Sequence, residues 1–315
     1  MATLIGRRLL TLIPILLLVS LGIYGLMALI PGDAAMQIAG GTGATEERIE
    51  RVRTELGLND PFLVQYGRWL GSAVQGDFGN SLVSGNSVSA EIASRLPVTL
   101  SLAFGAVVFG LLVGVPAGIL SGMRSGTKLD RGVMFGSTMG VAIPNFWLAM
   151  LLIVVFAVNT GWFPAVGFTR LTDSPLGWLH SLVLPSIALG AYVAASMARQ
   201  LRAELSDVMQ RSYVRTAWAK GGSSRVVIGK HALKNASIPA VTVLGLQLGT
   251  LIGGAVIVEQ IFSIPGLGSY LLRAVLSFDM PVIMGVVTMF VVVYVLMSLL
   301  VDITYGFLNP KVRVS

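Results

Sequence analysis

Six stretches of this chain, each about 18 residues or longer, contain no charged side chain. An α-helix of about 20 apolar residues crosses the roughly 30 Å hydrocarbon core of a bilayer. One Arg or Lys at the centre of such a helix would cost roughly 2.5–3.5 kcal/mol on insertion scales. The six uncharged runs therefore predict an all-α membrane protein with six transmembrane helices. The runs are Leu9–Ile30, Val98–Leu120, Val133–Val158, Ser181–Ala198, Ile238–Val258 and Val282–Val301.

The first run has an alternative interpretation as a cleaved secretory signal peptide. It follows Arg7 and Arg8 and is followed by small residues. Its apolar core is longer than the roughly 7–15 residues of a signal peptide. We therefore interpret it as a span, and five further spans follow in either case.

Composition narrows the class of protein further. The chain is 54% hydrophobic and only 12% charged, and it has no cysteine, which excludes disulfides and thiolate chemistry. The two histidines, His180 and His231, lie far apart in sequence and do not suggest a metal site. The net charge of +7 would suit nucleic acid, but in a membrane protein it more often reflects basic cytoplasmic loops.

The distribution of Lys and Arg predicts the orientation. If the N-terminus is cytoplasmic and the spans alternate, 15 of the 22 basic residues lie in inside segments. Five of the remaining seven lie in the long segment 31–97, and long loops contribute little to the positive-inside rule. Both termini are therefore predicted to be inside. No nucleic acid is expected as a partner, because the basic residues are held beside anionic lipid headgroups.

These boundaries divide the chain into regions. Residues 1–30 form the first transmembrane helix, 31–97 an external helical segment, and 98–310 a five-helix transmembrane core. Within the core, residues 199–237 form a cytoplasmic loop, and residues 311–315 form a cytoplasmic tail.

The external segment predicts two short helices. Thr45 can cap a helix whose first turn carries Glu46 and Glu47. Asp60-Pro61 is typical of an N-cap and a first helical position, and Gly57 would end the preceding helix. The second helix carries an aromatic stripe that we expect to pack on neighbouring helices in preference to binding a ligand: Phe62, Tyr66, Trp69 and Leu70.

The cytoplasmic loop also predicts two helices around a tight turn. Residues 211–220 favour a helix, Gly221-Gly222 breaks it, and Ser223-Ser224 can cap a second helix that begins near Arg225. One interpretation is a solvated basic loop, and the other is a short rigid helix presented to a cytoplasmic partner. The residues alone leave both open.

Polar and small residues inside the spans are candidates for the transport path or for helix packing. Asn145 and Gln247 are polar within the bilayer, so each should face protein or a water-filled path. Gly245, Gly249 and Gly253 recur every four residues, which favours close approach of another helix. Glu259 is expected to be an interfacial or hydrogen-bonded helix-end group and not a proton carrier.

Several motifs together resemble a known family. Residues 213–221 (YVRTAWAKG) followed by 230–235 (KHALKN) resemble the coupling-loop signature of ABC importer permeases, of the dipeptide, oligopeptide and nickel branch. The similarity covers nearly the whole chain. It includes GRRL at 6–9, PGD at 31–33, LGLNDP at 56–61, GDFG at 76–79, RLP at 95–97, PNFW at 144–147, LGLQLG at 244–249, VE at 258–259, PGLG at 265–268 and NPK at 309–311.

The resemblance implies a type I importer permease fold in a bacterial inner membrane. It implies a second homologous permease, two cytoplasmic ABC ATPases and an external substrate-binding protein as partners, with ATP and Mg²⁺ bound by the ATPases. The chain itself is not expected to be an enzyme or to bind a cofactor, and it contains no G-x-x-x-x-G-K-[ST] phosphate loop. The coupling residues that it implies are Tyr213, Arg215, Thr216, Ala217, Lys220, Gly221, Gly222, Ser223, Arg225 and His231.

One departure from the wider family concerns the start of the coupling motif. The generic permease motif begins Glu-Ala-Ala, whereas this chain has Arg215-Thr216-Ala217. The peptide branch matches this form, so short peptides are the leading cargo, followed by nickel chelates, glutathione and opine-like solutes.

Two other function classes are alternatives to the permease. A secondary transporter would need a central ionisable relay or paired broken helices. An intramembrane enzyme would need a motif such as H-E-x-x-H, which is absent from the sequence.

Overall fold

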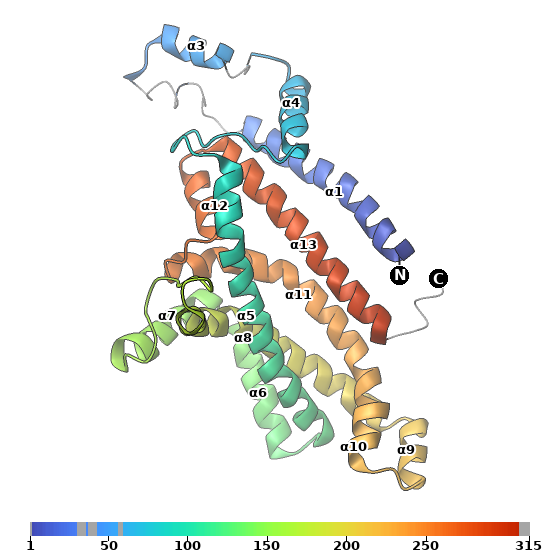
Figure 1. The fold of residues 1–315 in the computed structure, drawn as a ribbon. Helices are drawn as coiled ribbons and strands as arrows, with labels where there is room; N and C mark the ends of the chain where they lie inside the picture. Colours follow the sequence, from blue (N-terminus) through green and yellow to red (C-terminus); the bar gives the residue numbers. More distant parts are fainter. Residues whose placement is uncertain (1, 30–35, 37–42, 56–58, 309–315) are drawn as a thin grey trace.

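The fold is known from a computed structural model, which describes residues 2–29, 36, 43–55 and 59–308. Within these residues helices are the only regular secondary structure, apart from one isolated bridge between Asn80 and Ser87. Five long helices make up most of the molecule (Figure 1): α1 (Ala2–Leu29), α5 (Val88–Met123), α8 (Pro175–Met209), α11 (Lys234–Ile261) and α13 (Met280–Leu308). Shorter helices connect them: α3 (Glu46–Glu55), α4 (Phe62–Val74), α6 (Lys128–Ala142), α7 (Asn145–Leu152), α9 (Ser212–Ala219), α10 (Ser224–Val226) and α12 (Leu267–Leu276).

Four helices are long and apolar enough to cross a membrane, or five if one bent pair counts as a span. They are α5, α8, Pro239–Ile261 of α11 and Met280–Val301 of α13. In α1, the apolar stretch among the described residues is the shorter Ile13–Leu26. The all-helical membrane architecture is confirmed, and the number six remains a prediction.

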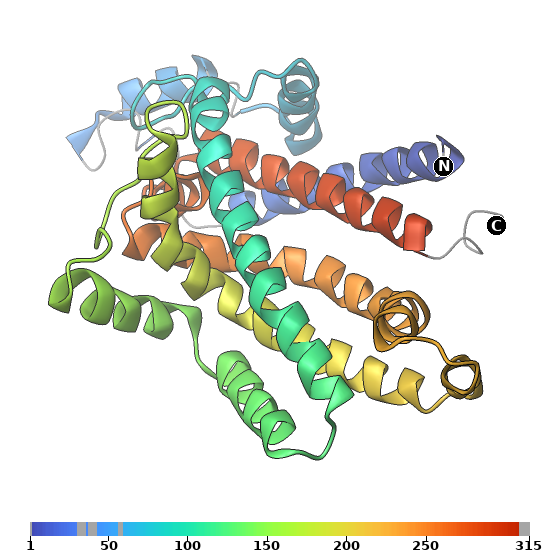
Figure 2. The ribbon, with the colours of Figure 1, turned by 60° about the horizontal axis from the view of Figure 1, so that its bottom comes forward.

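The third apolar run is not one straight helix, contrary to the simplest interpretation of Val133–Val158. Helix α6 ends at Ala142, and α7 continues into a π-helical turn, η2 (Ile153–Asn159), at 104° to α6 (Figure 2). The cause is Pro144, because a proline ring disfavours helical geometry in the residue before it. Ile143 accordingly has the extended backbone angles φ −76° and ψ 122°.

Helix α8 lies at the centre of the fold and packs closely along α5 (Figures 1 and 2). The contact is close because α5 presents four glycines at intervals of four residues: Gly110, Gly114, Gly118 and Gly122. A Cβ on Gly114 would lie 2.5 Å from the carbonyl oxygen of Ala194, so only glycine permits this approach. The glycine series predicted to pack helices lies on α11, and this longer series on α5 was not predicted.

Two buried carboxylates hold the short helix α12. The Oε1 atom of Glu259 accepts a hydrogen bond from Thr99 Oγ1 of α5 (2.6 Å), and Oε2 accepts one from the Ser269 amide in the first turn of α12 (2.8 Å). After α12, Asp279 accepts bonds from the Ser81 hydroxyl and the Leu82 amide. The prediction of Glu259 as a hydrogen-bonded helix-end group is confirmed.

The aromatic stripe of α4 packs on α1, as expected. The ring centroids of Tyr24 and Phe62 lie 5.4 Å apart, and the hydroxyl of Tyr66 lies 2.9 Å from Ser20 Oγ. Helix α4 begins at Phe62 with Pro61 as its N-cap, one residue later than the sequence suggests. The other segment helix, α3, begins at Glu46 as predicted.

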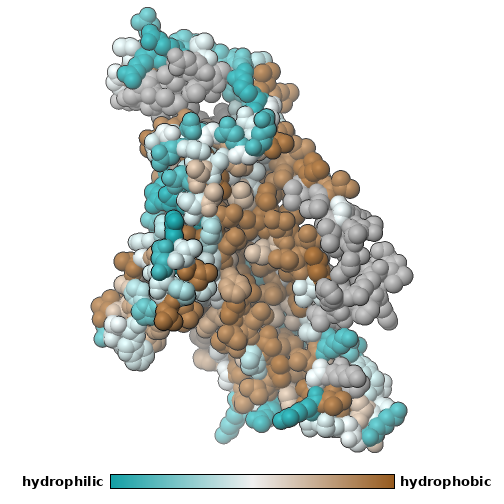
Figure 3. Space-filling view, in the orientation of Figure 1, coloured by the Kyte–Doolittle hydropathy of each residue, from teal (hydrophilic) through white to brown (hydrophobic). Residues whose placement is uncertain are grey.

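Hydrophilic residues gather at two opposite ends of the molecule. Figure 3 shows a broad apolar surface between a hydrophilic end that carries α3 and α4 and another that carries α9 and α10. Helices α3 and α4 and the basic segment 199–237 therefore lie at opposite ends of the apolar surface.

Candidate functional site

The segment 199–237 is mostly helical and is a loop only at two short breaks. Helix α8 continues to Met209, and α9 follows after two residues. A turn leads from α9 to α10, which continues as a π-helix, η3 (Val227–Leu233), into α11. The predicted arrangement of helix, glycine turn and helix is confirmed.

The turn after α9 depends on two glycines. Gly221 has φ +78°, a left-handed conformation that side chains with a Cβ rarely adopt. The Gly221 amide donates to the Trp218 carbonyl (2.9 Å) and the Gly222 amide to the Ala217 carbonyl (3.1 Å). This pair of hydrogen bonds is a Schellman motif, which satisfies carbonyls at the helix end. A Cβ on Gly222 would lie 2.9 Å from the Ala217 oxygen.

The predicted coupling residues form an exposed surface around this turn, with Ala217 and Gly222 partly buried beneath it. Tyr213 and Trp218 are large aromatic side chains with 41% and 40% of their surface exposed. The exposed polar members are Arg215, Thr216, Lys220, Ser223 and Arg225. The three basic side chains form no ion pair with any described residue, so they are available to a partner. The side chain of His231 lies outside the described part of the structure.

A buried apolar contact joins this surface to the rest of the permease. Val214 of α9 is fully buried and belongs to one hydrophobic core with Leu205 and Val208 of α8 and with Val227 of η3. The Tyr213 hydroxyl also accepts a hydrogen bond from Asn235 Nδ2 in α11 (3.2 Å). A force applied to α9 would therefore reach both α8 and α11.

Ion pairs fix the end of α8. The Arg202 guanidinium donates to Asp130 at the start of α6 (2.7 and 3.0 Å), and the buried Asp130 also accepts from the Ser121 hydroxyl and the Gly126 amide. Arg211 pairs with Asp207 at 2.7 Å, where both side chains are exposed. The Asp207 carboxylate raises the pKa of the Arg211 guanidinium above its ordinary value.

The two path candidates, Asn145 and Gln247, line neighbouring hollows between α8 and α11. One hollow, of about 350 Å³, is lined by Tyr192, Ser196, Arg199, Gln200, Val243 and Gln247. The other, of about 340 Å³, is lined by Asn145, Leu189, Tyr192, Thr250, Leu251, Gly253, Gly254 and Ile257. Tyr192 lines both, so the hollows are neighbours, and we call them together the α8–α11 groove.

The three glycines predicted to serve helix packing have different surroundings. A Cβ on Gly245 would lie 2.9 Å from Val301, and one on Gly249 would lie 3.3 Å from Tyr294, both on α13. No atom lies within 4 Å of a Cβ at Gly253, which lines the groove. The close approach occurs at Gly254, where a Cβ would lie 2.7 Å from Asn145 Nδ2. Gly253 therefore makes no such contact with the residues that the structure describes.

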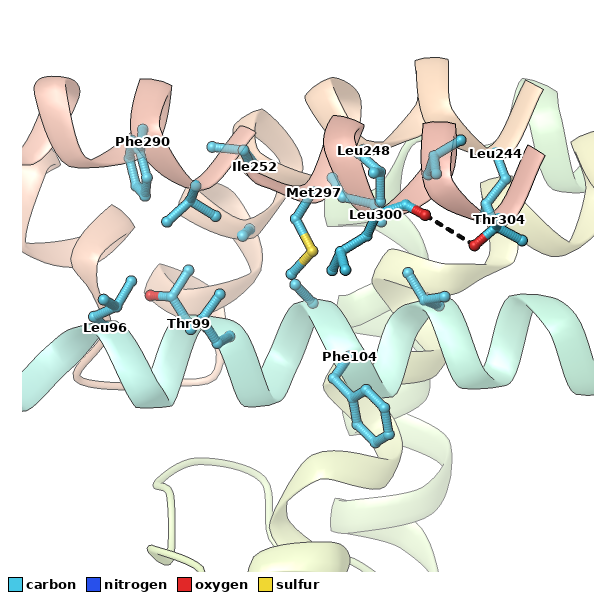
Figure 4. A pocket seen from close by; sticks show the side chains of 17 residues that line it. Leu96, Thr99, Phe104, Leu244, Leu248, Ile252, Phe290, Met297, Leu300 and Thr304 are labelled. Atoms are coloured by element: carbon cyan, nitrogen blue, oxygen red, sulfur yellow. Dashed lines mark hydrogen bonds between the residues drawn. The ribbon is translucent and has the colours of Figure 1, made fainter. Parts of the chain in front are cut away.

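A third cavity, of about 210 Å³, lies between α5, α11 and α13 (Figure 4). Leu96, Phe104, Phe290 and Met297 are among its lining residues. The Thr304 hydroxyl donates to the Leu300 carbonyl of its own helix, and the Thr99 hydroxyl donates to Glu259. The cavity thus offers apolar surface to an occupant, whereas the α8–α11 groove offers polar groups.

Comparison with known proteins decides which family this arrangement represents. Residues 114–314 match the family model for the binding-protein-dependent transport system inner membrane component, and residues 1–103 match the N-terminal model of the same transport systems. The chain belongs to this family. It is a permease of an ABC importer, a multi-pass protein of the bacterial inner membrane.

Relatives in sequence cover the whole chain. A Brucella abortus (strain 2308) protein named as a peptide transport system permease is 43% identical over 313 residues, which is 99% of both chains. The glutathione transport system permease protein of Escherichia coli (strain K12) is 44% identical over 307 residues, or 98% of this chain and 97% of that one. The predicted resemblance to the peptide branch is confirmed.

A solved structure supports the fold. An inward-facing form of the MetNI methionine ABC transporter contains a chain that aligns with a TM-score of 0.56 and 19% identity, over 70% of this permease and 96% of that chain. A second crystal form gives 0.57 and 20%. The type I importer permease fold is thereby confirmed. In this family the ATPase resides in separate subunits.

Proposed function

We propose that this permease imports short peptides, with a second homologous permease forming the other half of the path. An external substrate-binding protein delivers the peptide, and two cytoplasmic ATPases drive transport. The permease itself catalyses no reaction and binds no cofactor, and ATP and Mg²⁺ bind to the ATPases. The observation that carries the proposal is the exposed Gly221 turn, joined through Val214 to α8 and α11.

The coupling step follows from that geometry. The turn, with Tyr213, Trp218 and the three unpaired basic side chains, docks into a groove on an ATPase. When the ATPases close around ATP, they move α9, and the Val214 contact passes the motion to α8. Because the glycine series of α5 (Gly110, Gly114, Gly118 and Gly122) lets α8 pack directly against α5, these two helices move together. The α8–α11 groove then opens to one side of the membrane at a time.

Six spans with both termini inside remain part of the proposal. The start of α1 and the end of α13 lie on the same side of the bundle, which supports an even number of spans (Figure 1). The bent pair α6–α7 then counts as one span, and α1 as the first.

Cysteine labelling tests the orientation, because the natural chain has no cysteine. Single cysteines at the exposed Ser84 and Ser224 place one label site at each hydrophilic end. In intact spheroplasts, a membrane-impermeant maleimide should label Ser84→Cys and leave Ser224→Cys unlabelled until the membrane is broken. The reverse pattern would contradict the orientation.

The coupling proposal is tested by Gly221→Leu in the complete complex in proteoliposomes. We expect loss of ATP-dependent uptake and of ATPase stimulation by the loaded binding protein. Gly161→Leu is the matched control, because Gly161 also has a positive φ (+67°) with no atom near a Cβ, but lies in the segment between η2 and α8. It carries the same backbone strain at the predicted outer side. Normal uptake by Gly221→Leu would refute the coupling role.

The cargo has a second candidate, glutathione, because a relative 44% identical transports it by name. Nickel chelates and opine-like solutes remain further alternatives. Mass spectrometry of the ligand that copurifies with the complex and its binding protein distinguishes them. If the copurified ligand were a sugar, the peptide cargo would be refuted and the permease function would be unaffected.

A further inference from the structure

We propose that the α8–α11 groove contains a binding site for the carboxylate of the cargo, with Arg199 as its cationic residue. The proposal rests on the proposed function, because it assigns the groove to the translocation path of a carboxylate-bearing solute such as a short peptide.

The groove is built from one face of each helix. On α8, Leu189, Tyr192, Ser196 and Arg199 follow at intervals of three or four residues, the spacing of one helical face. On α11, the residues Val243, Gln247, Thr250 and Gly254 repeat the same spacing. Two membrane helices thus line one groove with several polar side chains, although polar side chains in a bilayer are costly unless they face protein or water.

Arg199 differs from the two arginines that follow it in the chain. Arg202 is held by Asp130 and Arg211 by Asp207, each at 2.7 Å. Arg199 is exposed and forms neither an ion pair nor a hydrogen bond with another described residue. The acid nearest in sequence, Glu204, accepts a hydrogen bond from the Gln200 amide (3.0 Å). A guanidinium without a carboxylate partner thus lines the groove.

The other groups around Arg199 suit the same ligand. The hydroxyls of Tyr192 and Ser196 form no hydrogen bond with a described residue, and the Gln247 amide lines the same hollow. A guanidinium with nearby hydroxyl and amide donors is the donor set that binds a carboxylate well. The two neighbouring hollows, of about 350 and 340 Å³, each have the size of a small-molecule site.

The position of the site indicates its role. Arg199 follows directly after the uncharged run Ser181–Ala198, at the predicted inner end of the span. Asn145 and Ile257 line the other end of the groove. A peptide that enters near Asn145 would meet the cation last, so Arg199 draws the carboxylate through the groove toward the cytoplasm.

Arg199→Gln in the complete complex, reconstituted with its binding protein, tests the site. The cargo probes are a dipeptide with a free C-terminal carboxylate and its C-terminal amide, after both are checked for binding to the external protein. Removal of a charged hydrogen-bonding partner should reduce uptake of the free acid about tenfold or more. Amide uptake and ATPase stimulation should stay at the wild-type level. Peptide transported per ATP hydrolysed falls by the same factor, which gives a second measurement that does not need the amide.

Arg131→Gln is the matched control, because Arg131 is exposed on α6, on the same predicted side, and does not line the groove. It should keep the wild-type ratio of acid to amide uptake. An equal fall for both peptides, or an unchanged ratio in Arg199→Gln, would overturn the proposal. So would loss of a bound anionic phospholipid from Arg199→Gln by native mass spectrometry with unchanged uptake, which would assign Arg199 to a lipid headgroup. If the wild type takes up neither peptide, the peptide cargo of the proposed function fails first.

Discussion

Helix α8 packs against two neighbours in opposite ways. We call its contact with α5 the closed seam and its contact with α11 the open seam. Along α5, glycines let the two backbones approach so closely that a Cβ at Gly114 would collide with the Ala194 carbonyl. Along α11, the neighbouring hollows leave Tyr192, Arg199 and Gln247 around an open groove. One helix therefore has a closed side and an open polar side. We therefore expect α5 and α8 to act as one rigid unit, and motion and cargo contacts to be confined to the α11 side.

The largest expected effect comes from breaking the closed seam with Gly114→Val. The added Cβ meets the backbone of Ala194 and the Cβ of Met197 (2.9 Å), and neither can move without shifting α8. We expect destabilisation of about 3 kcal/mol or more, typical of severe overpacking. The melting temperature of the purified complex measures it. Gly253→Val on the open seam is the control, and equal losses in both variants would show that the seams do not differ.

Asp130→Asn weakens the ion-pair cluster at the predicted inner end of the closed seam. Asparagine keeps one acceptor oxygen but loses the charge that binds Arg202, the Ser121 hydroxyl and the Gly126 amide. The expected cost is about 2 kcal/mol, the worth of a buried charged hydrogen bond. Asp207→Asn removes the exposed pair with Arg211 and should cost less than Asp130→Asn, because solvent screens an exposed ion pair. Thermal melting of both variants checks the order, and a larger loss in Asp207→Asn would contradict it.

Val214→Ala weakens the contact that joins the coupling turn to the closed seam. Loss of two buried methyl groups should cost about 1–2 kcal/mol. The sharper expectation is functional: ATPase stimulation by the loaded binding protein should fall while basal ATPase activity persists. Val226→Ala, at a residue that is 47% exposed beside the same turn, should leave stimulation unchanged. Full stimulation in Val214→Ala would show that motion reaches α8 by another contact.

The smallest effect is expected at Gly253. Its comparison with Gly254 tests which face of α11 lines the open seam. Gly253→Ala adds a methyl group where no atom lies within 4 Å and should change stability by less than about 0.5 kcal/mol. Gly254→Ala, one position later, meets Asn145 Nδ2 and the Leu189 Cδ1 atom at 2.8 Å, and should cost about 1 kcal/mol. If the two variants gave coinciding melting curves, the assigned helix face would be contradicted.

The sequence alone determined the membrane class, the local structure around Gly221 and the family. These depend on local rules: an uncharged run must span a bilayer, a glycine pair ends a helix, and ordered motifs mark relatives. The break in the third run was not predicted, although its cause, Pro144, is local, because the proline ring acts on the residue before it. Its size, 104°, required the structure.

Only the tertiary structure decided which helix faces meet. Gly114 and Gly253 both belong to four-residue glycine series, yet one is clasped by α8 and the other lines a groove. The sequence alone does not distinguish Arg199, Arg202 and Arg211, which differ in their partners. Asp130 pairs with Arg202 because α6 packs beside α8 in the folded chain. Spacing along a helix defines its faces, but the packing of distant segments determines whether a face is closed or left open to a ligand.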